Sequence, residues 1–230
     1  MVWFGFWLGL GLGVSFVLQA EAFRPMVGKS RSSTTHLSLS VMDSLSALFT
    51  PSSGTKSSVN TQAVKATIRK LAKGTQNGVK ASETTREAMA ALVADLEKVN
   101  PTKKLTSSSL IDGDWALLYT TNDGSSAGKL GPFVGTVFQE VDLDSAVYDN
   151  VVALGPLTGR LKATWSVESN TQWTVKFQTL VLSLFGIPLK QQELSAVGTW
   201  RMTYLDEDFR ILYAQGGKNI KKENVYILAK

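Results

Sequence analysis

The stretch that decides the fold is Leu157-Thr158-Gly159-Arg160-Leu161-Lys162-Ala163-Thr164-Trp165-Ser166-Val167. Apolar or small residues alternate with polar ones over its whole length. A second stretch, from Trp173 to Thr179, repeats this two-residue period. A period of two is typical of a β-strand with one face buried, and two such strands in succession predict an antiparallel hairpin.

Six further stretches carry strand-like patterns, and short turns rich in Gly, Asp, Ser and Asn separate several of them. They cover residues 115–121, 134–141, 147–153, 198–205, 209–214 and 224–229. Consecutive strands with few long crossovers predict a mainly β fold, either an up-and-down antiparallel barrel of about eight strands, which is favoured, or a strongly curled sheet. A barrel of this size is either filled by its own side chains or holds one small ligand.

Two or three short helices are expected before the strands. Residues 43–49 form a short apolar stretch, and a second stretch with helical spacing ends at Gly74. A third helix is expected to open at a capping box of Thr84 and Glu87 and to end before Pro101. Such helices carry an apolar stripe that covers another element.

The composition argues against most catalytic and nucleic-acid roles. The 230 residues contain no Cys and a single His, His36, while 43% of them are hydrophobic and 19% charged. No thiol or imidazole chemistry is therefore expected from the main domain, and we predict no catalytic residue, metal or cofactor. The acidic run Asp206–Asp208 lacks the glycine of a calcium loop, so a turn is favoured over a metal site.

The net charge of +5 overstates how basic the main domain is. Three basic residues and a single acid fall within the first 42 positions, so the remainder carries a net charge of +3. This small excess predicts no nucleic-acid partner, although it is compatible with an anionic lipid surface.

The first 42 residues resemble a two-part targeting leader. Residues 1–22 form an apolar run followed by Ala20-Glu21-Ala22, which favours a cleaved signal peptide over a membrane anchor. Residues 23–42 are rich in Ser and Arg and free of acids, as in an organelle transit segment, and residues 43–59 form a short helix and linker. A Phe at the junction, Phe23, resembles the bipartite leaders of algae with complex plastids, which implies delivery to the plastid.

Three residues are predicted to close the barrel. Gly113-Asp114-Trp115 resembles the Gly-x-Trp motif of lipocalins, in which an indole plugs the barrel floor. Arg210, on a late strand, could stack on that indole, and Asp206 is the nearest carboxylate to pair with it. An ordinary core position for Trp115 is the alternative.

Two other segments leave their roles open. Residues 124–135 contain four glycines without a phosphate-binding signature and are expected to form a loop at the barrel mouth. Residues 180–189 are apolar without alternation. They could form a lip inserted into lipid, but a buried corner is slightly favoured.

Blocks along residues 60–230 resemble the plastid lipid-associated protein, or fibrillin, family. The most specific ones are Leu110-Ile111-Asp112-Gly113-Asp114-Trp115, Gly198-Thr199-Trp200, Thr203 to Ile211 and Val225-Tyr226-Ile227-Leu228. Two positions depart from the family pattern, because Gln76-Asn77 and Tyr213-Ala214 stand where the family usually has basic residues.

The resemblance implies a lipocalin-like barrel at thylakoids or plastoglobules that binds prenylquinones, carotenoids or fatty acids. A partner-dependent accessory enzyme or assembly factor and a solid-cored structural coat are the alternatives. The expected barrel-interior residues are Trp115, Leu117, Tyr119, Phe138, Leu161, Ala163, Trp165, Val175, Phe177 and Trp200.

Overall fold

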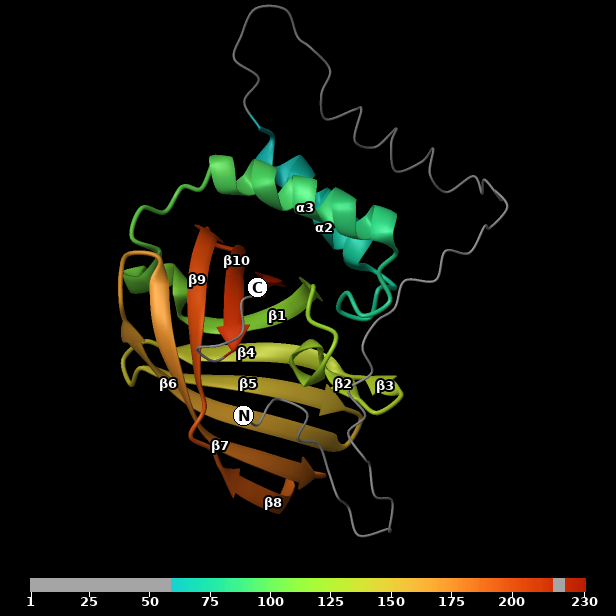
Figure 1. Ribbon diagram of the computed structural model, residues 1–230, viewed down its shortest axis with the longest axis vertical. Coiled ribbons are helices and arrows are strands. Elements are labelled where there is room, and N and C mark those ends of the chain that lie inside the picture. The colour runs from blue at the N-terminus through green and yellow to red at the C-terminus, as the bar shows by residue number, and fades with distance from the viewer. Residues whose placement is uncertain (1–58, 217–221) are drawn as a thin grey trace, which may run out of the picture. The chain divides into compact units, whose positions relative to one another are not determined.

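A computed structural model describes residues 59–216 and 222–230 (Figure 1). The predicted leader, its linker and the expected helix at residues 43–49 lie outside these residues. The described elements, in chain order, are α2 (Thr61–Ala72), α3 (Glu83–Lys98), η2 (Leu105–Ser107), η3 (Ser109–Ile111), β1 (Gly113–Thr120), η4 (Ser125–Ala127), β2 (Lys129–Leu130), β3 (Phe133–Val134), β4 (Thr136–Asp142), β5 (Val147–Leu154), β6 (Leu157–Val167), β7 (Gln172–Leu184), β8 (Ile187–Glu193), β9 (Val197–Leu205), β10 (Phe209–Gly216) and β11 (Asn224–Ala229).

The predicted antiparallel barrel is confirmed. The strands follow the order β1-β4-β5-β6-β7-β9-β10-β11, and β11 pairs with β1 to close an eight-stranded ring. Each neighbour in the ring is the next long strand along the chain, except that β8 leaves the ring and pairs only with β7. The meander therefore needs only short turns, as the spacing of the strand patterns indicates.

The segment that forms β8 was not predicted as a strand, and the neighbouring strand β7 is longer than its alternation indicates. The alternation in β7 breaks because of a bulge in the β6–β7 pairing beside Ala163. Phe177 lies opposite Ala163 and Leu180 lies opposite Leu161, so both face inward although they are three positions apart. A bulge adds one residue to one strand and reverses the phase of alternation beyond it. The apolar residues after position 179 are thus the continuation of an inward-facing strand.

Both predicted helices precede the barrel, but α3 begins earlier than its expected capping box. Ser82 is the N-cap and accepts a hydrogen bond from the Thr85 amide at 3.2 Å. Ser82 fulfils the cap because its extended backbone directs the side-chain oxygen toward the first free amides of the helix. The prediction that Thr84 and Glu87 open this helix is therefore wrong by two residues.

The two helices lie side by side across the outer face of β9, β10 and β1 (Figure 1). Their apolar stripes, including Ile68 and Leu96, are fully buried. They cover Tyr204 and Phe209 on the outside of the barrel, where Lys65 of α2 lies 5.8 Å from the Phe209 ring. This wall consequently has cores on both of its faces, one inside the barrel and one beneath the helices.

The loop between the helices crosses closely over β1. Gly78 has a φ of +97°, and a β-carbon at this position would lie 2.1 Å from the backbone oxygen of Thr120. The side-chain amide of Asn77 donates hydrogen bonds from Nδ2 to the backbone carbonyls of Ala127 and Gly135, at 2.9 Å each. The loop is thus fastened to both the barrel and the glycine-rich segment 124–135.

The β7–β8 hairpin projects from the barrel rather than forming a buried corner, so that preference was wrong. Phe185 is 78% exposed, Ile187 67% and Leu189 53%. Among the described elements, β8 has a strand neighbour on one side only, β7, and this leaves the hairpin exposed. The apolar tip lies at the lower end of the molecule in Figure 1.

Candidate ligand-binding site

One end of the barrel is closed by the segment η2–η3. The Trp115 indole donates a hydrogen bond to the Ile111 carbonyl at 2.7 Å, and the Trp173 indole donates one to the Thr106 carbonyl at 3.2 Å. Both indoles are fully buried. Two strands on different sides of the barrel are therefore anchored through aromatic rings to the same short segment, which forms the floor of the barrel.

The interior next to this floor is tightly packed. Ala163 and Val175 are fully buried, and Trp200 is 5% exposed. The Trp200 ring meets the Tyr148 ring edge-on, with the ring centroids 4.5 Å apart. This half of the barrel has a solid core.

Toward the other end, inward-facing side chains become accessible to solvent. Leu161 pairs across the strands with Asn150 and Leu180, and all three are partly exposed. Phe177 and Ala214, which face inward on neighbouring parts of the wall, are partly exposed as well. The barrel is thus closed at the floor. At the opposite end, which we call the mouth, part of the inward face is accessible to solvent, whereas Val137, Val152 and Leu182 are buried.

Strand pairing places eight of the ten predicted interior residues on the inward face. These are Trp115, Leu117, Leu161, Ala163, Trp165, Val175, Phe177 and Trp200. Trp165 stacks on Trp173 with the ring centroids 4.3 Å apart, so the two indoles form a continuous aromatic surface. Whether these residues contact a ligand remains a prediction.

The other two predicted residues face outward. Phe138 is 38% exposed because Gln139 and Val137, its neighbours along β4, are the buried ones. Tyr119 is 1% exposed, but a bulge after Leu117 turns it to the outer face, against Gly78 in the loop between the helices. Alternation alone cannot locate such a bulge, which is why Tyr119 was misplaced.

Of the three residues predicted to close the barrel, the structure brings Trp115 and Arg210 together and places Asp206 elsewhere. The Arg210 guanidinium lies 4.9 Å from the centroid of the Trp115 ring, which joins the first barrel strand to a late one. Asp206 does not pair with Arg210. It lies at the turn before β10, where its carboxylate accepts hydrogen bonds from the Phe209 amide and the Tyr204 hydroxyl.

Asp206 instead belongs to an ion-pair cluster under helix α2. Lys65 contacts Asp206 and lies 2.6 Å from Asp208, and Arg69 lies 2.9 Å from Asp208. Burial raises the pKa of the Asp208 carboxyl, but its bonds to Lys65 and Arg69 outweigh burial and leave that pKa lowered. The acidic run therefore fastens helix α2 to the barrel.

Arg210 has an unusual environment for a charged side chain. It is fully buried inside the barrel and donates a hydrogen bond to the Gln139 side-chain oxygen, while its Nε and Nη1 atoms have no partner among the described residues. Burial lowers the pKa of Arg210 to about 10, and the nearby Tyr148 only partly opposes this shift. The guanidinium keeps its positive charge at neutral pH.

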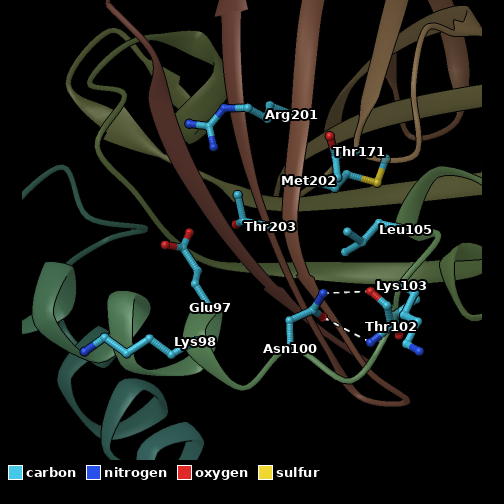
Figure 2. A pocket seen from close by; sticks show the side chains of 10 residues that line it. All are labelled: Glu97, Lys98, Asn100, Thr102, Lys103, Leu105, Thr171, Arg201, Met202 and Thr203. Carbon is cyan, nitrogen blue, oxygen red and sulfur yellow. Dashed lines mark hydrogen bonds between the residues drawn. The ribbon is translucent and has the colours of Figure 1, made fainter.

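A separate groove of about 590 Å³ lies outside the barrel, between the end of α3 and the outer side of β9 (Figure 2). Glu97, Asn100 and Arg201 contribute to its polar lining. Asn100 and Thr102 are hydrogen-bonded to each other across the chain bend after α3. Eight of the ten lining residues are polar or charged and the groove is open to solvent, so it cannot enclose a hydrophobic guest.

Several residues that shape the site were missed by sequence reasoning. Gln139 could have been found, because it is the polar member of an alternating strand whose other inward positions are apolar. Lys65 carried a weaker signal, as a charge next to the apolar stripe of its helix. Tyr148 offered none, since its role depends on its contact with Trp200, a residue distant in the sequence.

No helix within residues 59–216 and 222–230 is long and apolar enough to span a membrane. A family model, PAP_fibrillin, matches residues 62–220. No solved structure matches the chain significantly.

Curated relatives agree with this match. One is the probable plastid-lipid-associated protein 5, chloroplastic, of Arabidopsis thaliana, which is 28% identical over 61% of this chain and 60% of the relative. Others are the light-induced proteins, chloroplastic, of Solanum demissum and Solanum tuberosum, each 35% identical over 45% of this chain and 32% of the relative. The chain thus spans less than two thirds of the length of these relatives. Because the family model covers nearly the whole barrel and the helices before it, the chain belongs to the PAP_fibrillin family.

Proposed function

We propose that this chain is a plastid lipid-associated protein that holds a small hydrophobic metabolite in the mouth half of its barrel. The observation that carries the proposal is the contrast between a packed floor and inward-facing apolar residues that solvent reaches at the other end. Apolar surface that is left accessible inside a barrel is stabilised when a hydrophobic guest covers it. Prenylquinones, carotenoids and fatty acids have the required chemistry.

A quinone titration of the full chain tests this proposal. Trp200 lies across from Ala214 of the mouth, so a bound prenylquinone is expected to quench tryptophan fluorescence in a saturable manner. Mass spectrometry of lipid retained by the chain after purification gives the stoichiometry. Absence of both quenching and retained lipid would favour the structural coat, and turnover of a substrate would favour the accessory enzyme.

Peripheral association with a lipid surface forms the second part of the proposal. The tip of the β7–β8 hairpin exposes Phe185, Ile187 and Leu189 together, and contiguous exposed apolar residues are typical of interaction surfaces. Lys190 follows directly and supplies a positive charge that suits an anionic surface. This surface supports residence on a thylakoid or plastoglobule.

Vesicle flotation tests the hairpin. The double substitution Phe185→Ser with Ile187→Ser is expected to abolish co-flotation of the full chain with lipid vesicles without altering its melting temperature. Val167→Ser is the matched control, because Val167 is also 55% exposed but lies at the floor end of β6. Equal loss of flotation in both variants would contradict a specific role for the hairpin.

A plastid location is the third part of the proposal. The names of the relatives, which describe those proteins as chloroplastic, support it. Residues 1–42 fused to a fluorescent protein are expected to reach the plastid of an alga with complex plastids, whereas residues 1–22 alone stop in the endomembrane system. Phe23→Ala is expected to divert the longer fusion. Unchanged import of that variant would contradict the role given to the junction.

A further inference from the structure

Arg210 carries a charge that the described barrel interior does not neutralise. Its only hydrogen-bond partner among the described residues is the neutral side chain of Gln139. Nε and Nη1 have none, and the ion pairs of the described residues do not include Arg210. The carboxylates of Asp206 and Asp208, which lie close to Arg210 in the sequence, are both held on the outside by Lys65.

The neighbours of this guanidinium are neutral groups. The face of Trp115 stabilises a cation but offers no acceptor for its N–H groups. Tyr148 is buried, and its hydroxyl donates to Asn150 at 3.1 Å. Burial raises the pKa of Tyr148 well above its ordinary value, so at neutral pH the phenol is uncharged and cannot balance the guanidinium.

An anion could approach Arg210 from the mouth. Gln139 pairs across the strands with Asn150, and Asn150 is partly exposed. Asn150 in turn pairs with Leu161, which belongs to the accessible apolar wall. A row of inward-facing side chains therefore leads from the partly exposed Leu161 through Asn150 to Gln139, the hydrogen-bond partner of Arg210.

A buried charge with free N–H groups is costly unless an opposite charge accepts them. Guanidinium groups are well suited to carboxylates, whose two oxygens can accept two N–H groups at once. We propose that Arg210 and Gln139 anchor the carboxylate of an amphipathic acid, such as a fatty acid, whose hydrocarbon part lies along Leu161 and Phe177 toward the mouth. This inference rests on the proposed function and specifies the ligand class and its orientation.

The test compares a fluorescent long-chain polyene fatty acid with its methyl ester, both titrated into the full chain. The acid is expected to bind about 10- to 100-fold more tightly than the ester, as for a hydrogen bond to a charged group. In Arg210→Met the acid should lose this advantage, while the ester keeps its affinity. Circular dichroism and a thermal melt show that the variant is folded.

Arg160→Met is the matched control, because Arg160 pairs with Glu140 and Asp149 on the outer wall. This variant is expected to leave the affinities for the acid and for the ester unchanged. Gln139→Leu is expected to reduce the preference for the acid in part, which provides a second measurement if Arg210→Met does not fold. Equal binding of acid and ester by the native chain, or an acid preference that persists without Arg210, would overturn the inference and leave the proposed function standing. Failure of both ligands to bind would overturn the inference, and the proposed function would fall with it only if the quinone titration and the retained-lipid analysis are negative as well.

Discussion

Two alanines on the inward face of the barrel allow the packed floor and the accessible mouth to be compared by the same substitution. Ala163 is fully buried and pairs across the strands with Tyr148 and Phe177. Ala214 pairs with Trp200 and is partly exposed. A Phe at Ala163 must displace neighbours that are already in contact, whereas a Phe at Ala214 can extend into space that solvent reaches.

Overpacking of a solid core costs about 1–3 kcal/mol, so Ala163→Phe is expected to reduce the free energy of unfolding by this amount. For a domain of this size that corresponds to a fall of roughly 2–12 °C in melting temperature. Ala214→Phe is expected to cost less than about 1 kcal/mol, because part of the added ring remains in accessible space.

Urea unfolding followed by tryptophan fluorescence, together with a thermal melt, measures both changes. Ligand titration separates the two sites further, since Ala214→Phe should weaken binding of a hydrophobic guest that occupies the mouth. An unchanged stability of Ala163→Phe would refute a solid floor. Equal losses of stability in the two variants would refute the distinction between floor and mouth.

Three more substitutions probe how the barrel is held together. Lys65→Met is expected to destabilise the fold by about 1–3 kcal/mol, because it leaves the carboxylates of Asp206 and Asp208 without their buried cationic partner. This loss is smaller than for a fully buried ion pair, since the Asp208 side chain is 46% exposed. Because the pKa of Asp208 is lowered in the folded state, its ion pair stabilises the fold at pH values above the ordinary pKa of 3.8. This stabilisation disappears as the pH falls through the lowered pKa of the folded state. The unfolding curves of the native chain and of Lys65→Met should therefore converge in acid. Gly78→Ala is expected to reduce the free energy of unfolding by more than about 2 kcal/mol, because it combines an unfavourable positive φ with a clash against the β1 backbone. A melting temperature close to that of the native chain would contradict this. Trp115→Phe removes the hydrogen bond to the Ile111 carbonyl and should cost about 1–3 kcal/mol in urea unfolding, a loss that an unbonded indole would not produce.

The charge of Arg210 affects how its own variants behave. A pKa lowered from 12.5 to about 10 corresponds to roughly 3 kcal/mol by which burial disfavours the charged form. Replacement by Met removes this penalty together with the contact to the Trp115 face, and the two changes have opposite signs. The variant is therefore expected to fold, in contrast to a variant that leaves a buried carboxylate without its partner.

The sequence by itself determined the class of fold, the order of the strands and most of the inward face. Alternation in residues 157–167 indicates which side chains share a face, because successive residues of a strand point in opposite directions. Short turns between consecutive strands then leave the meander as the simplest arrangement. Helical stripes before the strands identified a covering layer for the same local reason.

Tertiary structure alone decided the features that depend on register and on contacts between distant residues. A bulge after Leu117 turned Tyr119 outward, and no local pattern marks where such an extra residue falls. Closure of the ring placed Arg210 beside Gln139, 71 positions earlier, whereas the carboxylate four residues away went to a lysine of helix α2. Sequence periodicity specifies which face a side chain occupies, but the partner it meets there is set by how whole strands and helices align, which is a property of the complete fold.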